Sequence, residues 1–373
     1  MMIVVFLLFL VLLPDVYIWF SFVRGSSLIV SVLHWLPTFV VLVSMLIFGT
    51  NRSPTALQVT FFLVVCLTFP KLLFAVVSLL GKGIAIFVPK AFCVGNVVAL
   101  VVLLIAFVLA VYGSTMGWKR LQVNEQTLHF ATLPESFDGY KIVQISDLHL
   151  GTNGKSTAFV EKIVDTINSL SPDLVVFTGD LVNTDVSEIQ PFKCVLTKIK
   201  ARDGVFSILG NHDYFIYGDP KTREQSLDTL ISVERGLGWN LLLNETRIIK
   251  RGDDSIALVG VEYIGKFTNP RGDLGKAMQN VEPESFTILL SHDPWHWRHE
   301  VLPKTNIELT LSGHTHAAQL KIGRFSPSQW VFEDWGGMYN SENQVLNVSV
   351  GAGGTAPFRL GAWPEINVIS LHR

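Results

Sequence analysis

The sequence KIVQISDLH, residues 141–149, sets the pattern for the second half of the chain. A β-rich run, Lys141–Ser146, ends directly in two side chains of metal-binding type, Asp147 and His149. In an extended chain, residues i and i+2 face the same way, so these two side chains can hold one ion together. The sequence therefore predicts a strand that delivers metal ligands at its carboxyl end.

Four later segments repeat this order of strand and polar side chain. Leu174–Thr178 leads into Asp180, Gly204–Leu209 into Asn211, His212 and Asp213, Ser285–Leu290 into His292, and Ile307–Leu311 into His314 and His316. Singly, each motif has a plainer interpretation as a turn or a core histidine. Five of them in order, each after a strand, favour a site at the carboxyl edge of an α/β sheet, where ligands bind.

The residue types at these positions suit transition metals. Mixed imidazole and carboxylate ligation favours Mn, Fe or Zn over Ca or Mg. The Asp180 carboxylate can share its two oxygens between two ions, and Asn211 offers a neutral amide oxygen. Two ions about 3.5–4 Å apart activate a water and clamp the oxygens of a phosphoryl transfer. We therefore expect two divalent metal ions and no organic cofactor.

Other segments complete the expected architecture. The remaining candidate strands are a first one near Gln126–Ala131, then Ser255–Val261, Val345–Val350 and Ile366–Leu371. The candidate helices are Ser156–Leu170, Ser187–Lys200, Arg223–Arg235 and Leu274–Val281. Alternation of strands and helices predicts an α/β sandwich in one domain.

The first third of the chain has the composition of a membrane region. The whole chain is 49% hydrophobic and 16% charged, whereas soluble domains carry about 25% charged residues. Residues 1–112 hold only six charged residues, and runs of about 20 apolar residues are long enough to cross a bilayer. We expect four transmembrane helices near residues 2–23, 27–48, 56–80 and 91–113. The predicted domains are a transmembrane region, 1–115, and a catalytic domain, 116–373.

Several properties of the two regions follow from charge and cysteine content. After Tyr112 there are 24 basic and 30 acidic residues, so a general nucleic-acid surface is not expected.

Basic residues are divided equally between the two sides of the predicted spans, which leaves the orientation of the chain in the membrane open. Lys71 either snorkels or faces another helix, with a functional intramembrane charge as the alternative. Three cysteines cannot build a disulfide scaffold.

The ordered motifs D-x-H, G-D, G-N-H-D, H and G-H-x-H, from Asp147 to His316, resemble the calcineurin-like metallophosphoesterase superfamily. The resemblance covers about residues 125–373 and implies a four-layer αββα sandwich with a dinuclear metal centre. It implies that one metal is held by Asp147, His149, Asp180 and His316, and the other by Asp180, Asn211, His292 and His314. It also implies that His212 is the general acid and that Asp213 orients His212 through its other ring nitrogen.

Within the superfamily, the chain is similar to bacterial membrane-associated members, some of which cleave the pyrophosphate of UDP-diacylglucosamine. One departure is Ala317, where glycine is expected after the last histidine. Its methyl group is expected to narrow the space beside the metals. The predicted spans make the chain a multi-pass membrane protein, and the resemblance, which does not cover these spans, implies the bacterial cell membrane and hydrolysis of a phosphodiester or pyrophosphate bond. Only about a dozen residues separate the last predicted span from the first candidate strand, which favours a substrate at the membrane surface, including a lipid-linked one. The alternative is a catalytically silent membrane protein that uses the fold for binding or transport.

Overall fold

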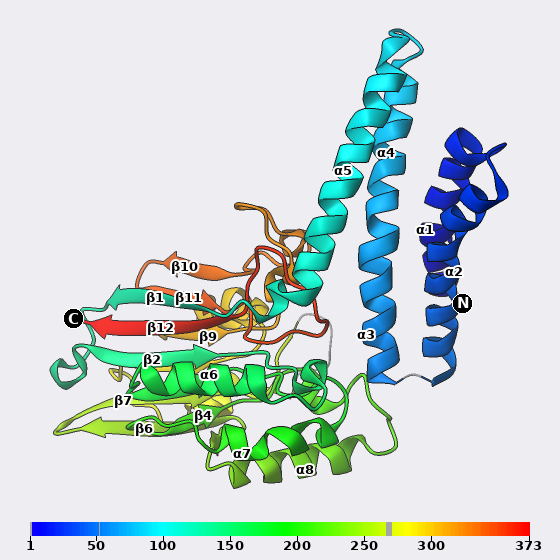
Figure 1. Cartoon of the computed structure of the whole chain (residues 1–373). Helices are drawn as coiled ribbons and strands as arrows, with labels where there is room; N and C mark the ends of the chain where they lie inside the picture. Colours follow the sequence, from blue (N-terminus) through cyan, green and yellow to red (C-terminus); the bar gives the residue numbers. More distant parts are fainter. Residues whose placement is uncertain (1, 52, 266–270) are drawn as a thin grey trace. The chain divides into compact units, whose positions relative to one another are not determined.

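The computed structural model describes residues 2–51, 53–265 and 271–373 (Figure 1). The chain divides into two compact units. The first comprises Met1–Gly117 with Ala356–Phe358, and the second comprises Trp118–Thr355 with Arg359–Arg373. Each unit is described separately below.

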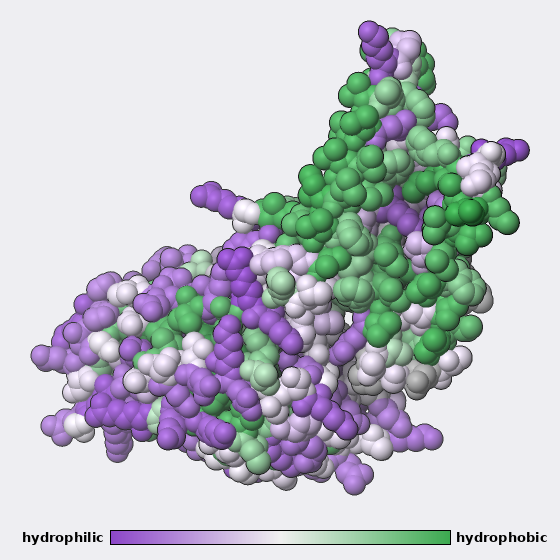
Figure 2. Space-filling model, in the orientation of Figure 1, coloured by the Kyte–Doolittle hydropathy of each residue, from purple (hydrophilic) through white to green (hydrophobic). Residues whose placement is uncertain are grey.

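The first unit consists of apolar helices. They are α1 (Met2–Ile18), α2 (Leu28–Asn51), α3 (Pro54–Leu63), α4 (Phe69–Ile84) and α5 (Lys90–Thr115). A π-helical turn at Val64–Thr68 joins α3 to α4 in one continuous helical run. Pro70, which has no N–H to donate, lies in the first turn of α4. The surface of these helices is predominantly hydrophobic (Figure 2).

Three helical runs in the described part of the chain are long and apolar enough to cross a membrane: Leu28–Thr50, Thr55–Ile84 and Lys90–Lys119. The run Leu7–Val23 is apolar but shorter. The predicted spans near 27–48, 56–80 and 91–113 therefore correspond to candidate membrane helices. The span near 2–23 stays a prediction.

Lys71 faces other helices of this unit. Its Nζ atom lies 2.8 Å from a carboxylate oxygen of Asp15 on α1 and 3.1 Å from the hydroxyl of Thr38 on α2. Thr38 donates to the second carboxylate oxygen of Asp15 at 2.5 Å, and Nε2 of His34 lies 3.1 Å from the Asp15 carbonyl. An ion pair with two polar neighbours thus links α1, α2 and α4 in an otherwise apolar environment.

The second unit contains two six-stranded sheets. Sheet A has the order β1-β12-β2-β3-β4-β5, with β12 and β2 antiparallel and the other neighbours parallel. Its strands are β1 (Gln122–His129), β2 (Tyr140–Ile145), β3 (Leu174–Phe177), β4 (Val205–Ser207), β5 (Asn240–Leu241) and β12 (Glu365–His372).

Sheet B has the order β10-β11-β9-β8-β7-β6, with antiparallel pairs only at its two edges. Its strands are β6 (Glu245–Arg251), β7 (Asp254–Gly260), β8 (Thr287–Leu290), β9 (Leu309–Ser312), β10 (Gly337–Ser341) and β11 (Gln344–Val348). The central strands are buried on both faces, which explains their nearly continuous apolar sequence.

Three hydrophobic layers hold this unit together. The middle layer lies between the sheets, where Ile142 and Val176 of sheet A meet Leu258 and Leu311 of sheet B. The alternate residues of sheet A point outward onto α6 (Ala158–Ser169), α7 (Lys193–Leu196) and α8 (Arg223–Gly236). The outer face of sheet B is covered by α9 (Leu274–Met278) and the turn around Trp297, with α10 (Leu302–Lys304) after it. The result is the expected αββα sandwich.

The differences from the predicted elements have local causes. The predicted helix Ser187–Lys200 is mostly a 3₁₀ run with α7 at its end, because Pro191 interrupts the hydrogen-bonding pattern. Strand β6 was not predicted, since its sequence ETRIIKR lacks apolar alternation and it lies at a sheet edge. Strands β5 and β10 were also missed, because two residues and a Gly-Met-Tyr-Asn-Ser sequence carry little strand signal.

Candidate metal centre

Five loops at the carboxyl ends of parallel strands supply the predicted site residues. Strands β2, β3 and β4 of sheet A lead into Asp147 and His149, Asp180, and Asn211 to Asp213. Strands β8 and β9 of sheet B lead into His292, and into His314 and His316. Because both sheets present these ends to the same edge of the sandwich, side chains up to 169 positions apart in sequence meet there.

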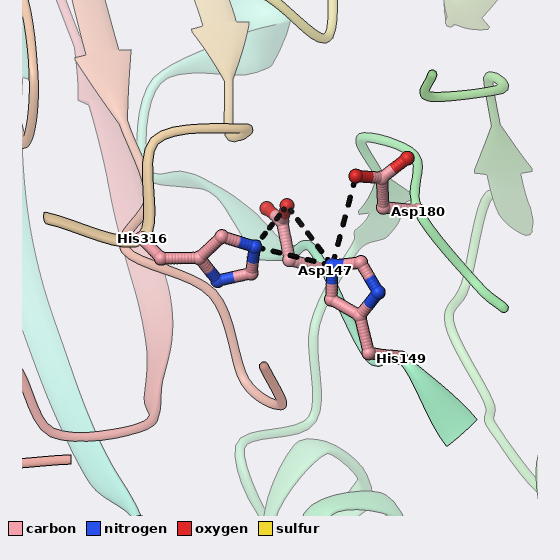
Figure 3. A group of neighbouring side chains, drawn as sticks. All are labelled: Asp147, His149, Asp180 and His316. Atoms are coloured by element: carbon pink, nitrogen blue, oxygen red, sulfur yellow. Dashed lines mark hydrogen bonds and ion pairs between the residues drawn. The ribbon is translucent and has the colours of Figure 1, made fainter. Parts of the chain in front are cut away.

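The first donor group comprises Asp147, His149, Asp180 and His316 (Figure 3). All four are buried, with candidate ligand atoms within 4.8 Å of one another. The Nε2 atoms of His149 and His316 are 3.1 Å apart, and an Asp147 carboxylate oxygen lies 3.3 Å from Nε2 of His316. Two ligands that each bind an ion at about 2.1 Å lie about 3.0–3.4 Å apart, so these spacings fit one metal ion.

The second donor group comprises Asp180, His292 and His314. Nδ1 of His292 donates to the Thr178 carbonyl at 2.7 Å, so Nε2 points to Asp180, 3.2 Å from its carboxylate. Asp180 is common to both groups. Asn211 is buried, and among the described residues its Oδ1 has no hydrogen-bond partner, as is also true of Nδ1 of His314. Unpaired buried donors and acceptors of this kind fit a site that holds ions.

Burial favours the neutral form of every ionisable side chain, which suits the histidine ligands and opposes ionisation of the carboxylates. It lowers the pKa of His149 to about 3 and holds the pKa of His316 well below its usual range. Burial also acts to raise the pKa of Asp180, but the charges of His292 and His212 outweigh it, and the pKa of that carboxyl lies well below its usual range. Metals bind neutral imidazole and ionised carboxylate, so His149, His316 and Asp180 have the required charge states. His292 differs: burial acts to lower its pKa, but the Asp180 carboxylate outweighs burial and raises the pKa of His292 to about 10, so a cation takes the place of a proton there.

The ligands converge through turned backbone and not through extended chain. Asp147, His149, Asp180, His314 and His316 all have positive φ, between 43° and 75°. The argument from the i and i+2 positions of a strand was therefore wrong for Asp147 and His149, although Nε2 of His149 does lie 3.9 Å from an Asp147 carboxylate oxygen. Left-handed backbone at residues other than glycine is unfavourable and clusters at functional sites.

Two glycines allow the loops to approach one another. A Cβ atom at Gly313 would collide with Ser146 and the Asp147 carboxylate, and one at Gly210 would collide with the Asp180 carboxylate. The glycines of the GNHD and GHTH motifs are thus required by the close passage of backbone past a ligand.

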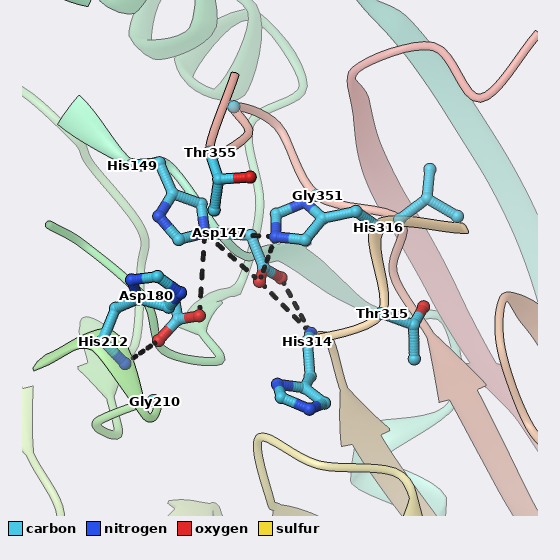
Figure 4. Close-up of polar contacts among 12 residues, drawn as sticks. Asp147, His149, Asp180, Gly210, His212, His314, Thr315, His316, Gly351 and Thr355 are labelled. Carbon is cyan, nitrogen blue, oxygen red and sulfur yellow. Dashed lines mark hydrogen bonds and ion pairs between the residues drawn. The ribbon is translucent and has the colours of Figure 1, made fainter. Parts of the chain in front are cut away.

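His212 lies beside the first group (Figure 4). Its backbone N–H donates to an Asp180 carboxylate oxygen at 2.8 Å, and its ring is perpendicular to that of His149, with centroids 4.7 Å apart. Nδ1 of His212 donates to the carbonyl of Asn183 at 2.7 Å, which leaves Nε2 without a role in positioning the ring.

Asp213 does not make the expected contact with His212. Its two carboxylate oxygens accept from the backbone N–H groups of Asp180 at 2.7 Å, Leu181 at 2.8 Å, Val182 at 3.2 Å and Gly210 at 2.9 Å. Burial raises the pKa of Asp213 to about 7, while these amides act in the opposite direction. His212 and Asp213 lie in a 3₁₀ turn, which directs the two side chains apart, so the predicted role of Asp213 as orienter of His212 was wrong.

Arg359 was not identified from the sequence. It is fully buried, and its Nη2 lies 2.6 Å from the carbonyls of Val350 and Gly353 and 3.4 Å from Nδ1 of His316. The N–H of Gly353 in turn donates to the carbonyl of Asp147 at 2.9 Å. Arg359 therefore fixes a loop against two ligands. An arginine between glycine- and proline-rich segments was the only signal, and it is a weak one.

The alanine at the expected glycine position affects the backbone. Ala317 and Ala318 have φ of +50° each, in the left-handed region that favours glycine. Ala317 is fully buried in a small cluster with Val350 and Ala362, so its methyl group packs into the protein. The methyl group of Ala317 was expected to narrow the space beside the metals, but it packs against the protein instead. The consequence of the two alanines is conformational strain in the backbone of the turn.

Several known metallophosphoesterases are similar in sequence to this chain. Residues 140–318 match the family model "Calcineurin-like phosphoesterase". The uncharacterized metallophosphoesterase YkuE of Bacillus subtilis is 31% identical over 263 residues, which is 67% of this chain and 85% of that protein. The UDP-2,3-diacylglucosamine pyrophosphatase LpxG of Chlamydia trachomatis is 29% identical over 288 residues, 63% of this chain and 85% of that protein.

A zebrafish (Danio rerio) "Transmembrane protein with metallophosphoesterase domain" is 31% identical over 282 residues, 72% of this chain. The match spans only 61% of the zebrafish protein, and 54% of a cattle (Bos taurus) protein of the same name. By its match to YkuE over most of that protein's length, and by the family model over the site, the chain belongs to the calcineurin-like phosphoesterase family.

Proposed function

We propose that the chain is a membrane-anchored, metal-dependent phosphoesterase that hydrolyses a phosphodiester or pyrophosphate bond. One observation carries the proposal: two donor groups share the Asp180 carboxylate, with His212 beside them. A carboxylate common to two sites is the arrangement that holds two ions close together.

In this proposal Asp147, His149, Asp180 and His316 hold one ion, and Asp180, Asn211, His292 and His314 hold the second. The donors suit Mn, Fe or Zn. When bound, such ions supply an activated water and neutralise charge on the phosphoryl oxygens. Most of the side chains that would hold the ions are buried, which fixes the ligand positions and largely closes them to bulk solvent.

His212 is the proposed general acid. Because its Nδ1–H donates to the Asn183 carbonyl, Nε2 is the atom that holds the proton and delivers it to the leaving oxygen. The backbone bond to Asp180 keeps the imidazole next to the metal ligands without making it one of them. Asp213 contributes indirectly, since it fixes the backbone amides on either side of Asp180.

We propose that the substrate is a lipid-linked phosphodiester or pyrophosphate and that the enzyme meets it at the membrane surface. Two observations support this: the three candidate membrane helices of the same chain, and the similarity to LpxG, whose name specifies a lipid-linked pyrophosphate. The proposed division is a transmembrane region over residues 1–115 and a metallophosphoesterase domain over residues 116–373. The proposed location is the bacterial cell membrane, with several spans.

The direct test is elemental analysis of the purified full chain and of Asp180→Asn. The native protein should bind two divalent ions per chain, and Asp180→Asn should lose both metal and diesterase activity, because one bridging carboxylate stabilises both ions. Asp165→Asn, an exposed position on α6, is the matched control and should keep both. Full metal content and activity in Asp180→Asn would refute the assignment.

A further inference from the structure

The segment Leu320–Phe332 lies between β9 and β10 (Figure 1). It exposes an unusual amount of apolar surface for the second unit. In the described part of residues 118–373, seven large hydrophobic side chains are exposed, and four of them lie inside this segment, within the ten residues 322–331. These four are Ile322, Phe325, Trp330 and Val331, and Trp330 is 75% exposed. The apolar surface is therefore concentrated and not scattered, which marks an interaction site.

The segment is held rigidly beside the metal ligands. Ser326 donates to the carbonyl of Ala317, the residue after the ligand His316, at 2.7 Å. At its other end, the Phe332 ring lies against His314, with ring centroids 5.4 Å apart. The tip is a tight turn in which Ile322 and Phe325 form a β-bridge, and Phe325 packs edge-on against Trp330. The side chains of Phe325 and Trp330 are thus exposed on a loop that hydrogen bonds and ring contacts hold in place.

The charges of this segment select the partner. Leu320–Phe332 contains two exposed basic residues, Lys321 and Arg324, and no acidic residue, although residues 113–373 as a whole are acidic. The exposed Glu333 that follows the segment lies 3.4 Å from Nε of Arg298, which offsets its charge. Aromatic side chains flanked by lysine and arginine match the interface of an anionic bilayer, where rings lie at headgroup level and cations attract lipid phosphates. The same chain carries three candidate membrane helices, so a bilayer is the surface to which the proposed function attaches it.

We propose that Leu320–Phe332 docks on the surface of an anionic phospholipid bilayer, with Trp330 and Phe325 in the interface and Lys321 and Arg324 at the lipid phosphates. This inference rests on the membrane-surface part of the proposed function. The contact brings the loop that carries His314 and His316 to the depth of lipid headgroups. Leu320–Phe332 would then contact lipid in addition to the candidate membrane helices of the first unit.

The test uses the full chain in nanodiscs of phosphatidylcholine and phosphatidylglycerol. Cys93→Ser and Cys194→Ser remove the two exposed thiols, and a fluorophore is attached to Trp330→Cys or, as the control, to Ile248→Cys on the edge strand β6. Quenching is measured with doxyl-labelled lipid and with aqueous iodide. The label at 330 should be quenched by doxyl lipid and shielded from iodide, and the label at 248 should behave in the opposite way.

The charge requirement is tested by combining Lys321→Ala with Arg324→Ala, or by using phosphatidylcholine alone. Each cation removed should lower the ratio of docked to free segment about fivefold. Equal iodide quenching at 330 and 248 would overturn the proposal, as would shielding at 330 from both quenchers, which would indicate a second protein copy. Lipid quenching in a protein without diesterase activity would support the docking and contradict the proposed function, so the two can fail independently.

Discussion

The contacts of Asp213 predict that Asp213→Asn damages stability more than chemistry. The asparagine keeps one oxygen, which can still accept from Leu181 and Val182. Its NH₂ group replaces the oxygen that accepts from the N–H groups of Asp180 and Gly210 at 2.7 and 2.9 Å. Two buried N–H groups then face a donor.

The size of the effect follows from those two lost acceptors. A buried amide left without its acceptor costs about 1–3 kcal/mol, so the variant should lose roughly 2–6 kcal/mol of unfolding free energy. For a domain of this size, each kcal/mol corresponds to about 2–4 °C in Tm, so Tm should fall by at least about 4 °C. The displaced backbone carries Asp180, so metal retention should weaken as well.

The assay is thermal unfolding of the detergent-solubilised full chain with elemental analysis, at pH 8, where the native Asp213 is ionised. The leaving-group dependence of kcat on aryl phosphodiesters is measured in parallel. Asp228→Asn, exposed on α8, controls for the loss of one carboxylate. If Asp213→Asn kept native Tm and metal content but lost activity selectively on poor leaving groups, then Asp213 would orient the acid after all, and the structural reasoning would be refuted.

Four further predictions concern other parts of the chain. His212→Ala should lower kcat by about 10²–10⁴ on substrates with poor leaving groups and less on nitrophenyl esters, with unchanged metal content; an equal loss on both would argue against an acid role. Ala318→Gly should raise stability by about 0.5–1 kcal/mol in thermal unfolding because φ is positive there, whereas Ala277→Gly inside α9 should lower it. Asp15→Ala should destabilise the helical unit by about 3–5 kcal/mol by leaving Lys71 unpaired, and adding Lys71→Met should restore much of that loss in a detergent unfolding assay. Chelation by EDTA should abolish diesterase activity, and Mn²⁺ or Zn²⁺ should restore it; activity that survives metal depletion confirmed by elemental analysis would contradict a metal-dependent reaction.

The sequence alone determined the fold class and the identity of the site loops. Apolar runs that end in Asp147, Asp180, Asn211, His292 and His314 are local signals, because a buried parallel strand needs continuous apolar residues and its carboxyl end faces the ligand edge. The long uncharged runs predicted candidate membrane helices in the same way, since length and composition alone decide whether a helix can cross a bilayer.

Only the tertiary structure decided how those residues are used. Asp213 was assigned to His212 as its sequence neighbour, but a 3₁₀ turn sends its carboxylate to the amides of the β3 loop, 31 to 33 positions away. The partner of His212 is a backbone carbonyl, at Asn183, and a carbonyl carries no residue-type signal. Arg359 and the Lys71–Asp15 pair are joined to their partners across 43 and 56 positions. Such contacts depend on how loops and helices pack, and no local pattern of residues encodes them.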